Sequence, residues 1–113
     1  MRDGTVNEEE LARMLKALAS PSRLRIFNLL VEGTQCNCEI SERLGYSLSL
    51  ISHHTKVLSE LGLVRSERDQ HDARWIYHSI DRVKLNEVYA SVKHLLDPER
   101  VQVRQPSCGP RIC

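Results

Sequence analysis

The sequence predicts a mainly α-helical domain of the α+β class, with five helices and one two-stranded β-hairpin. Two observations support this fold class. Apolar residues recur at helical spacing through most of the chain, whereas residues 63–80 hold two short segments, partly β-branched or aromatic, on either side of a polar turn. A length of 113 residues allows one domain with a modest core, so we expect a dimer that shares apolar surface.

Capping residues and glycines predict where the first three helices begin and end. The acidic run Glu8–Glu10 suits the first N-terminus, because acidic side chains are favourable at the positive end of a helix. Ser20 suits the second N-terminus. Gly33 ends the second helix, and a short third helix covers Cys38–Leu44 and stops at Gly45.

The next segment predicts a helix-turn-helix followed by a wing. Ser47 is the N-cap of a fourth helix, whose apolar stripe begins at Leu48. Two short helices separated by Gly45-Tyr46 are typical of a helix-turn-helix, and the hairpin of residues 63–80 is the wing. Asp81 caps a fifth helix with an apolar stripe. We therefore expect a dimeric winged helix-turn-helix domain over residues 1–97 and a flexible cysteine-containing tail over residues 98–113.

Composition excludes some functions and leaves DNA binding to local features. The formal net charge is only +1, from 16 basic and 15 acidic side chains, so bulk charge does not favour nucleic acid. A Gly-rich phosphate loop, paired carboxylates and a nucleophile motif are all missing from the sequence, which argues against an enzyme. With neither a membrane-spanning apolar run nor a signal peptide, we expect a cytoplasmic protein that does not bind membranes.

The fourth helix and the wing carry the side chains expected to bind DNA. A reading helix needs small hydrogen-bonding groups near its N-terminus, with cations or amides for phosphates, and the wing turn can touch the backbone or minor groove. The candidate residues are Ser47, Ser49, Ser52, His53, His54, Lys56, Gln70, His71 and Arg74. A solvated helix face, or a helix-turn-helix used for protein interaction, fits this pattern as well. His53 and His54 suit DNA contact or helix packing better than metal binding.

Four cysteines predict a site for a soft metal or metalloid. Cys36 and Cys38 lie at the start of the third helix, where the helix dipole favours the thiolate that binds metals. Residues two apart on a regular helix point about 200° apart, so binding one ion through both sulfurs would unwind or tilt this helix start. Two thiolates are too few for a trigonal or tetrahedral site. The remaining candidates are Cys108 and Cys113 in the tail.

Several motifs, in order, resemble the ArsR/SmtB family of metal-responsive repressors. They span most of the chain, from about Glu8 to Leu96: Leu18–Ile26, Cys36–Ile40, Ser49–Leu58, Gly62–Arg65 and Arg74–Tyr77. The resemblance implies a homodimer joined through its first and last helices, with the helix that begins at Ser47 reading an inverted repeat of operator DNA.

The chain departs from the family's arsenic-sensing pattern, Cys-x-Cys-x-x-Cys, at its third position, which is Ser41. We therefore expect Cys36 and Cys38 to join one or both tail thiols in binding As(III) or Sb(III), which releases the DNA. Binding of Cd(II), Pb(II) or Zn(II) by all four thiolates, and a thiol-redox switch, are the alternatives. The family's second zinc site, on the last helix, is not expected, because Val83 stands where a histidine is needed and His94 is isolated.

Overall fold

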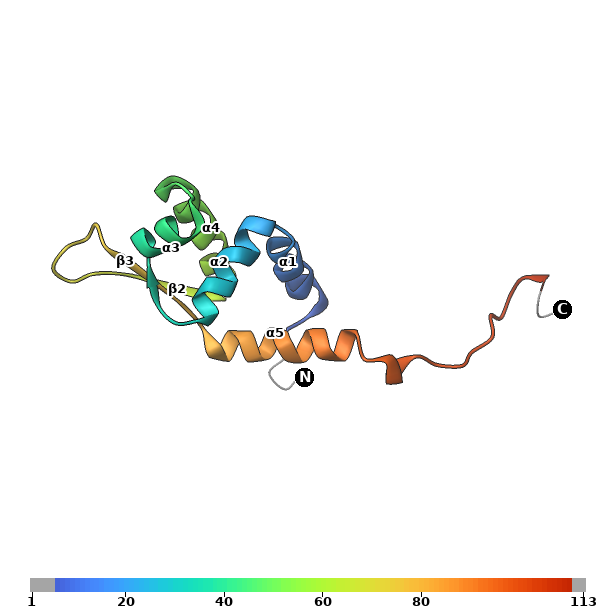
Figure 1. Ribbon diagram of the computed structural model, residues 1–113. Coiled ribbons are helices and arrows are strands. Elements are labelled where there is room, and N and C mark those ends of the chain that lie inside the picture. The colour runs from blue at the N-terminus through green and yellow to red at the C-terminus, as the bar shows by residue number, and fades with distance from the viewer. Residues whose placement is uncertain (1–5, 111–113) are drawn as a thin grey trace.

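The computed structural model describes residues 6–110, and its helices follow the predicted order (Figure 1). Both the five helices and the wing are confirmed. The elements are α1 (Glu8–Leu18), α2 (Pro21–Val31), β1 (Gln35–Cys36), α3 (Asn37–Leu44), α4 (Leu48–Glu60), β2 (Val64–Arg68), β3 (Ile76–Ile80), α5 (Arg82–Leu95) and the short 3₁₀ helix η1 (Pro98–Arg100).

Side-chain caps begin the helices where the sequence predicts. Ser20 accepts a hydrogen bond from the backbone N–H of Arg23, and Ser47 accepts one from that of Leu50. The carboxylate of Asp81 accepts from the backbone N–H of Lys84. Each cap satisfies an N–H group that the helix itself leaves without a partner. The cap residues therefore fix the starting points of α2, α4 and α5.

The core lies where the first four helices meet the base of the wing. Its fully buried side chains come from each of these helices and from the residue before β2. They are Met14, Ile26, Ile40, Ile51, Leu58 and Leu63. The predicted apolar stripe of α4 departs from the core at its start: Leu48 is 50% exposed, because the first three residues of α4 stand clear of the core.

The sheet has three antiparallel strands in the order β1-β3-β2, so the predicted two-stranded hairpin is extended by a short third strand. Strand β1 pairs with β3 through the registers Gln35↔His78 and Cys36↔Tyr77. This pairing joins the start of α3 to the wing. A two-residue strand carries no alternation pattern, which is why the sequence did not predict it.

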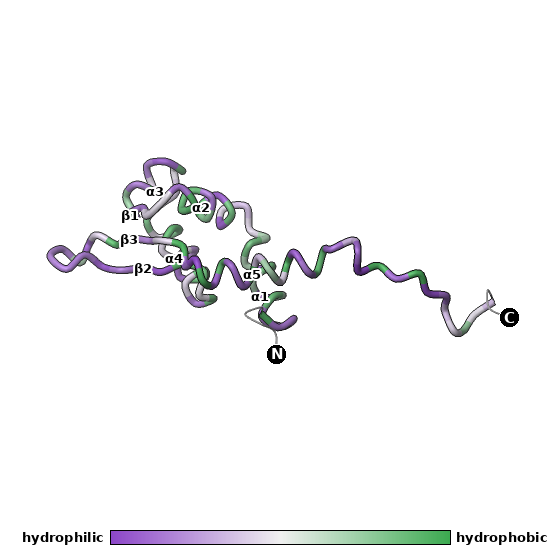
Figure 2. The backbone as a smooth tube through the Cα atoms, turned by 90° about the horizontal axis from the view of Figure 1, so that it is seen from below, coloured by the Kyte–Doolittle hydropathy of each residue, from purple (hydrophilic) through white to green (hydrophobic). Residues whose placement is uncertain are grey.

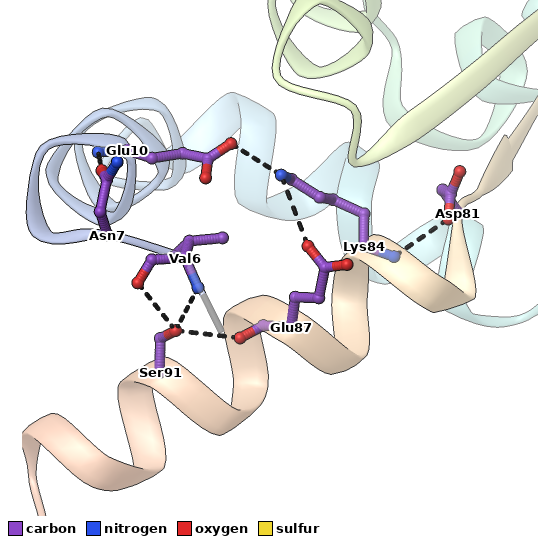
Figure 3. A network of polar contacts seen from close by, with 7 residues as sticks. All are labelled: Val6, Asn7, Glu10, Asp81, Lys84, Glu87 and Ser91. Carbon is purple, nitrogen blue, oxygen red and sulfur yellow. Dashed lines mark hydrogen bonds and ion pairs between the residues drawn. The ribbon is translucent and has the colours of Figure 1, made fainter. Parts of the chain in front are cut away.

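A polar network ties α1 to α5 (Figure 3). The Lys84 ammonium lies 2.7 Å from a carboxylate oxygen of Glu10 on α1 and 3.7 Å from one of Glu87 on α5. The backbone N–H of Val6 donates to the hydroxyl of Ser91, which in turn donates to the carbonyl of Glu87. The alkyl chain of Lys84 also lies against Gly62, where an added Cβ would be 3.7 Å from it.

Beyond this network, apolar side chains of α5 remain uncovered. Val83, Tyr89 and Leu95 are exposed on a helix whose hydrophobic and hydrophilic residues alternate along its length (Figure 2). After η1 the chain extends away from the domain, and residues 101–110 are all exposed (Figure 1). Within residues 6–110, no helix is both long and apolar enough to cross a membrane.

Candidate nucleic-acid interface and thiol pair

The turn between α3 and α4 is held by backbone geometry and one serine. Gly45 adopts a left-handed conformation, with φ 72°, and its N–H donates to the carbonyl of Ser41 at 2.8 Å. The hydroxyl of Ser41 donates to the carbonyl of Tyr46 at 2.7 Å. Ser41 therefore has a structural role in the helix-turn-helix, at the position where the arsenic-sensing pattern has its third cysteine.

The exposed face of α4 matches the predicted set of DNA-binding residues, with one exception. Ser47, Ser49, Ser52, His53 and Lys56 are all exposed. His54 is only 7% exposed, so of the two roles expected for it, DNA contact or helix packing, its position supports packing. The helix period places residue 54 close to the buried side of Ile51 and Leu58.

His54 is paired with Arg23 rather than left free. Nη1 of Arg23 lies 3.1 Å from Nδ1 of His54, and Nε of Arg23 donates to the carbonyl of Ala17 at 2.7 Å. Burial lowers the pKa of His54 below its ordinary value of 6.5, and the charges of Arg23 and His53 lower it further. Neutral His54 therefore accepts from Arg23, and this arginine connects the end of α1 with the middle of α4.

The wing tip places the three predicted residues Gln70, His71 and Arg74 at the surface. Figure 2 shows that this tip is hydrophilic. The guanidinium of Arg74 forms a two-point contact with Asp72, with Nη2–Oδ2 at 2.7 Å and Nε–Oδ1 at 3.0 Å. These bonds lower the pKa of the Asp72 carboxyl. Arg74 is therefore held in place, and its charge is partly offset by a neighbouring carboxylate.

The two cysteines before α4 lie in different environments. Cys36 is the N-cap of α3 and is 6% exposed, whereas Cys38 is exposed in the first turn of α3. The backbone N–H of Cys36 donates to the carboxylate of Glu39 at 2.8 Å, and this bond lowers the Glu39 pKa. The start of α3 is therefore fixed by a capping box.

The tail thiols are not joined to this pair in the single chain. Cys108 is free and exposed in the extended tail, and Cys113 lies outside the described residues. Among residues 6–110, no group of three or more His, Cys, Asp and Glu side chains is placed to hold a metal ion. The chain by itself thus offers one buried and one exposed thiol at α3, with a further thiol on the tail.

Two features of this interface had no signal in the sequence pattern. Arg25 donates to the hydroxyl of Tyr46 at 3.2 Å, which places a cation beside the turn that precedes α4. Leu48 and Leu50 are exposed beside Ser49 in the first turn of α4. Helical periodicity alone assigns leucines to the core, so it does not show that these two stay exposed.

Known proteins match this chain in sequence and in structure. The family model described as "Bacterial regulatory protein, arsR family" matches residues 20–66. An uncharacterized HTH-type transcriptional regulator of Methanocaldococcus jannaschii is 37% identical over 79 residues, which make up 67% of this chain and 85% of that protein. An arsenical resistance operon repressor of Staphylococcus xylosus is 35% identical over 80 residues, covering 69% of this chain and 77% of its own length.

A solved structure titled as a possible transcriptional regulator for arsenical resistance has a TM-score of 0.65 and 32% identity. The matched region makes up 75% of this chain and 85% of the chain in that structure. The fold and these matches define a transcriptional repressor of the winged helix-turn-helix class. Within that class, the chain belongs to the ArsR family of bacterial regulatory proteins.

Proposed function

We propose that the protein is a cytoplasmic homodimeric repressor whose operator DNA is released when As(III) or Sb(III) binds the thiolates of Cys36 and Cys38. The observation that carries this proposal is the position of Cys36, which is at once the N-cap of α3 and the last residue of β1. A ligand at this sulfur acts on both parts of the expected DNA interface.

The DNA-binding half of the proposal rests on the exposed face of α4. Ser49, Ser52 and His53 offer hydrogen-bonding groups, and Lys56 offers a cation to a phosphate. In a helix-turn-helix, the second helix enters the major groove with its N-terminal residues toward the base edges. Because phosphate contacts release counterions, the logarithm of the DNA affinity should fall linearly as the logarithm of the salt concentration rises.

The dimer supplies a surface for the uncovered residues of α5. Val83, Tyr89 and Leu95 are large apolar side chains exposed to solvent in the single chain. Packing α5 against a second copy would remove them from water, and a two-fold dimer presents two α4 helices to an inverted repeat. Sedimentation of the purified protein tests this part directly.

The thiol half rests on chemistry and on geometry. Thiolates are the ligands that soft ions prefer, and a helix N-terminus favours the charged form of a thiol. Cys36 is buried and Cys38 is exposed, so an ion that binds both sulfurs must reach the buried one, and we expect the first turn of α3 to rearrange when it does. Ser41 does not complete the site, because its hydroxyl donates within the turn. The tail thiols, Cys108 and Cys113, are the proposed additional ligands.

Rearrangement at Cys36 would disturb the interface by two routes. The capping bond from Cys36 to Glu39 belongs to α3, which packs against α4. Cys36 also pairs with Tyr77 of the wing, and the neighbouring Asn37 side chain accepts from the backbone N–H of Ile76 at 3.3 Å. Bound metalloid would then lower the affinity of the protein for DNA. By linkage, bound DNA would lower the affinity of the protein for the metalloid by the same factor.

The same four thiols would also hold Cd(II), Pb(II) or Zn(II), or form disulfides, so one experiment must separate these ligands. Operator DNA bound to the protein is challenged separately with arsenite, antimonite, Cd(II), Pb(II), Zn(II) and peroxide. Release by arsenite and antimonite at the lowest concentrations is expected. If only peroxide releases the DNA, the metalloid proposal is refuted in favour of a redox switch. If only Cd(II), Pb(II) or Zn(II) releases it, the ligand is that metal ion and not As(III) or Sb(III).

Two kinds of variant assign the ligands. Cys36→Ser removes the sulfur and keeps a good N-cap, because serine is a preferred cap residue, so the variant should fold, bind DNA and fail to respond to arsenite. Cys38→Ser, at an exposed position, should behave in the same way. A chain truncated after Pro98 tests the tail thiols. Unchanged arsenite affinity and DNA release in this chain would eliminate the tail from the site.

A further inference from the structure

Two leucines stand exposed at the start of the helix that faces DNA. Leu48 is 50% exposed and Leu50 is 36% exposed, whereas the next residue, Ile51, is completely buried. Burying such side chains normally stabilises a protein, each by about 1.5–3 kcal/mol. Both lie in one helical turn, with the exposed Ser49 between them in the chain and their side chains about 200° apart around the helix axis, so each leucine would meet a different base pair.

The surroundings of this turn favour a negatively charged partner over an apolar protein surface. From Arg43 to Ser59 the chain has no acidic residue, and the N-terminus of α4 carries the positive end of its dipole. Arg25, bonded to Tyr46 just before α4, adds a cation beside it. The local charge on α4 and at Arg25 therefore favours the approach of a phosphate to this turn.

The groups in this turn that are free to contact a base edge are mostly apolar. The hydroxyl oxygen of Ser47 accepts the backbone N–H of Leu50 at 3.1 Å and is thus engaged as a cap. This leaves Leu48, Ser49 and Leu50 at the N-terminal end of the helix, the end that meets base edges in a helix-turn-helix. The apolar group that an unmodified base pair presents in the major groove is the 5-methyl group of thymine.

We propose that Leu48 and Leu50 contact thymine methyl groups, and that this contact selects T·A pairs in each operator half-site. The inference rests on the proposed DNA-binding function and specifies its sequence preference. Ser49 supplies an adjacent hydrogen bond to a base or phosphate, while the two leucines discriminate by shape and by removal of water from the methyl group. Cytosine presents an amino group here instead and lacks the methyl.

The test uses the native protein and altered DNA. Operator sequences are first selected from random double-stranded DNA. Each thymine of the selected half-site is then replaced by uracil, which removes only the methyl group and preserves base pairing. Loss of one buried methyl contact should weaken binding by about fourfold. We expect such a loss at one or two positions per half-site and no loss at the other thymines.

Variants then assign the contact to its residue. Leu48→Gln and Leu50→Gln change exposed positions, so both should fold, and their melting temperatures check this. Each variant should lose discrimination between thymine and uracil at one position and keep it at the position read by the other leucine. Val103→Gln is the matched control, because Val103 is a fully exposed apolar residue of the tail; it should discriminate as the native protein does.

Each outcome separates the two levels of the proposal. If no DNA is enriched, the proposed DNA-binding function fails and the inference fails with it. If DNA is enriched but uracil substitution changes nothing, or Leu48→Gln and Leu50→Gln retain full discrimination, methyl recognition is refuted while DNA binding stands. Association of copies that these variants abolish, without any methyl effect, would show that the leucines contact a second copy instead.

Discussion

Replacing Arg23 by methionine should destabilise the fold far more than the same replacement two residues later. Arg23 spans two helices, donating to the Ala17 carbonyl at 2.7 Å and lying 3.1 Å from Nδ1 of His54. Methionine keeps most of the alkyl chain and removes both contacts. Within the described structure it thereby takes away the guanidinium that links the end of α1 to α4.

The magnitude follows from the number and setting of these contacts. A hydrogen bond from a charged donor contributes about 1.5–3 kcal/mol, and a buried acceptor left without a partner adds a desolvation cost. Both contacts are only partly buried, which reduces the effect. We expect Arg23→Met to lower the free energy of unfolding by about 2–4 kcal/mol.

Arg25→Met is the matched control. Arg25 lies on the same helix, is exposed, and donates one bond to the exposed Tyr46 hydroxyl at 3.2 Å. Its replacement should change stability by no more than about 0.5 kcal/mol. Urea unfolding of the three proteins at one fixed concentration measures the difference, because the stability of any protein that self-associates depends on its concentration. Equal losses in the two variants would refute the idea that Arg23 joins α1 to α4.

The remaining predictions concern pH, one cap and one turn. Lowering the pH from 7 to 5 should destabilise the fold, because burial lowers the pKa of His54 and His78 from 6.5. Below pH 6.5 the unfolded chain therefore binds protons at these histidines that the folded chain does not bind. The contribution of the neutral histidines to the free energy of unfolding is fully present above pH 6.5 and is lost as the pH falls below it. A flat urea-unfolding profile across this range would contradict this linkage. Ser47→Ala should lower the free energy of unfolding by about 1 kcal/mol, because it removes the acceptor for the backbone N–H of Leu50. An unchanged urea-unfolding midpoint would contradict this. Gly45→Ala should cost about 1 kcal/mol from backbone strain alone, because a Cβ there meets nothing within 4 Å. Gly45→Asn should cost less than alanine in thermal melts, and the reverse order would exclude strain as the cause.

The sequence predicted those parts of the fold that depend on local chemistry. Ser20, Ser47 and Asp81 cap helices because a cap needs only a suitable side chain three residues before an N–H group. Gly45 is similarly determined by its own backbone conformation. Periodicity then identified the helices, since their apolar faces must meet one core.

The sequence could not assign features that depend on distant partners. The sequence leaves the role of His54 open between DNA contact and helix packing, because the partner of its buried ring, Arg23, lies 31 positions earlier. Leu48 fits the apolar stripe, yet nothing in the stripe reveals that the first turn of α4 projects past the core. The separation of the buried Cys36 from the exposed Cys38 likewise depends on the strand pairing with Tyr77.

Lys84 links three parts of the fold: α1, α5 and the residue that follows the end of α4. Its alkyl chain covers Gly62 directly after α4, while its ammonium binds Glu10 of α1 and Glu87 of α5. A shift of α5 relative to α1 must therefore either break an ion pair of Lys84 or move Gly62, which follows the end of α4. If two copies associate through α1 and α5, Lys84 couples their arrangement to the position of α4. The angle between the two subunits and the distance between their α4 helices would then change together.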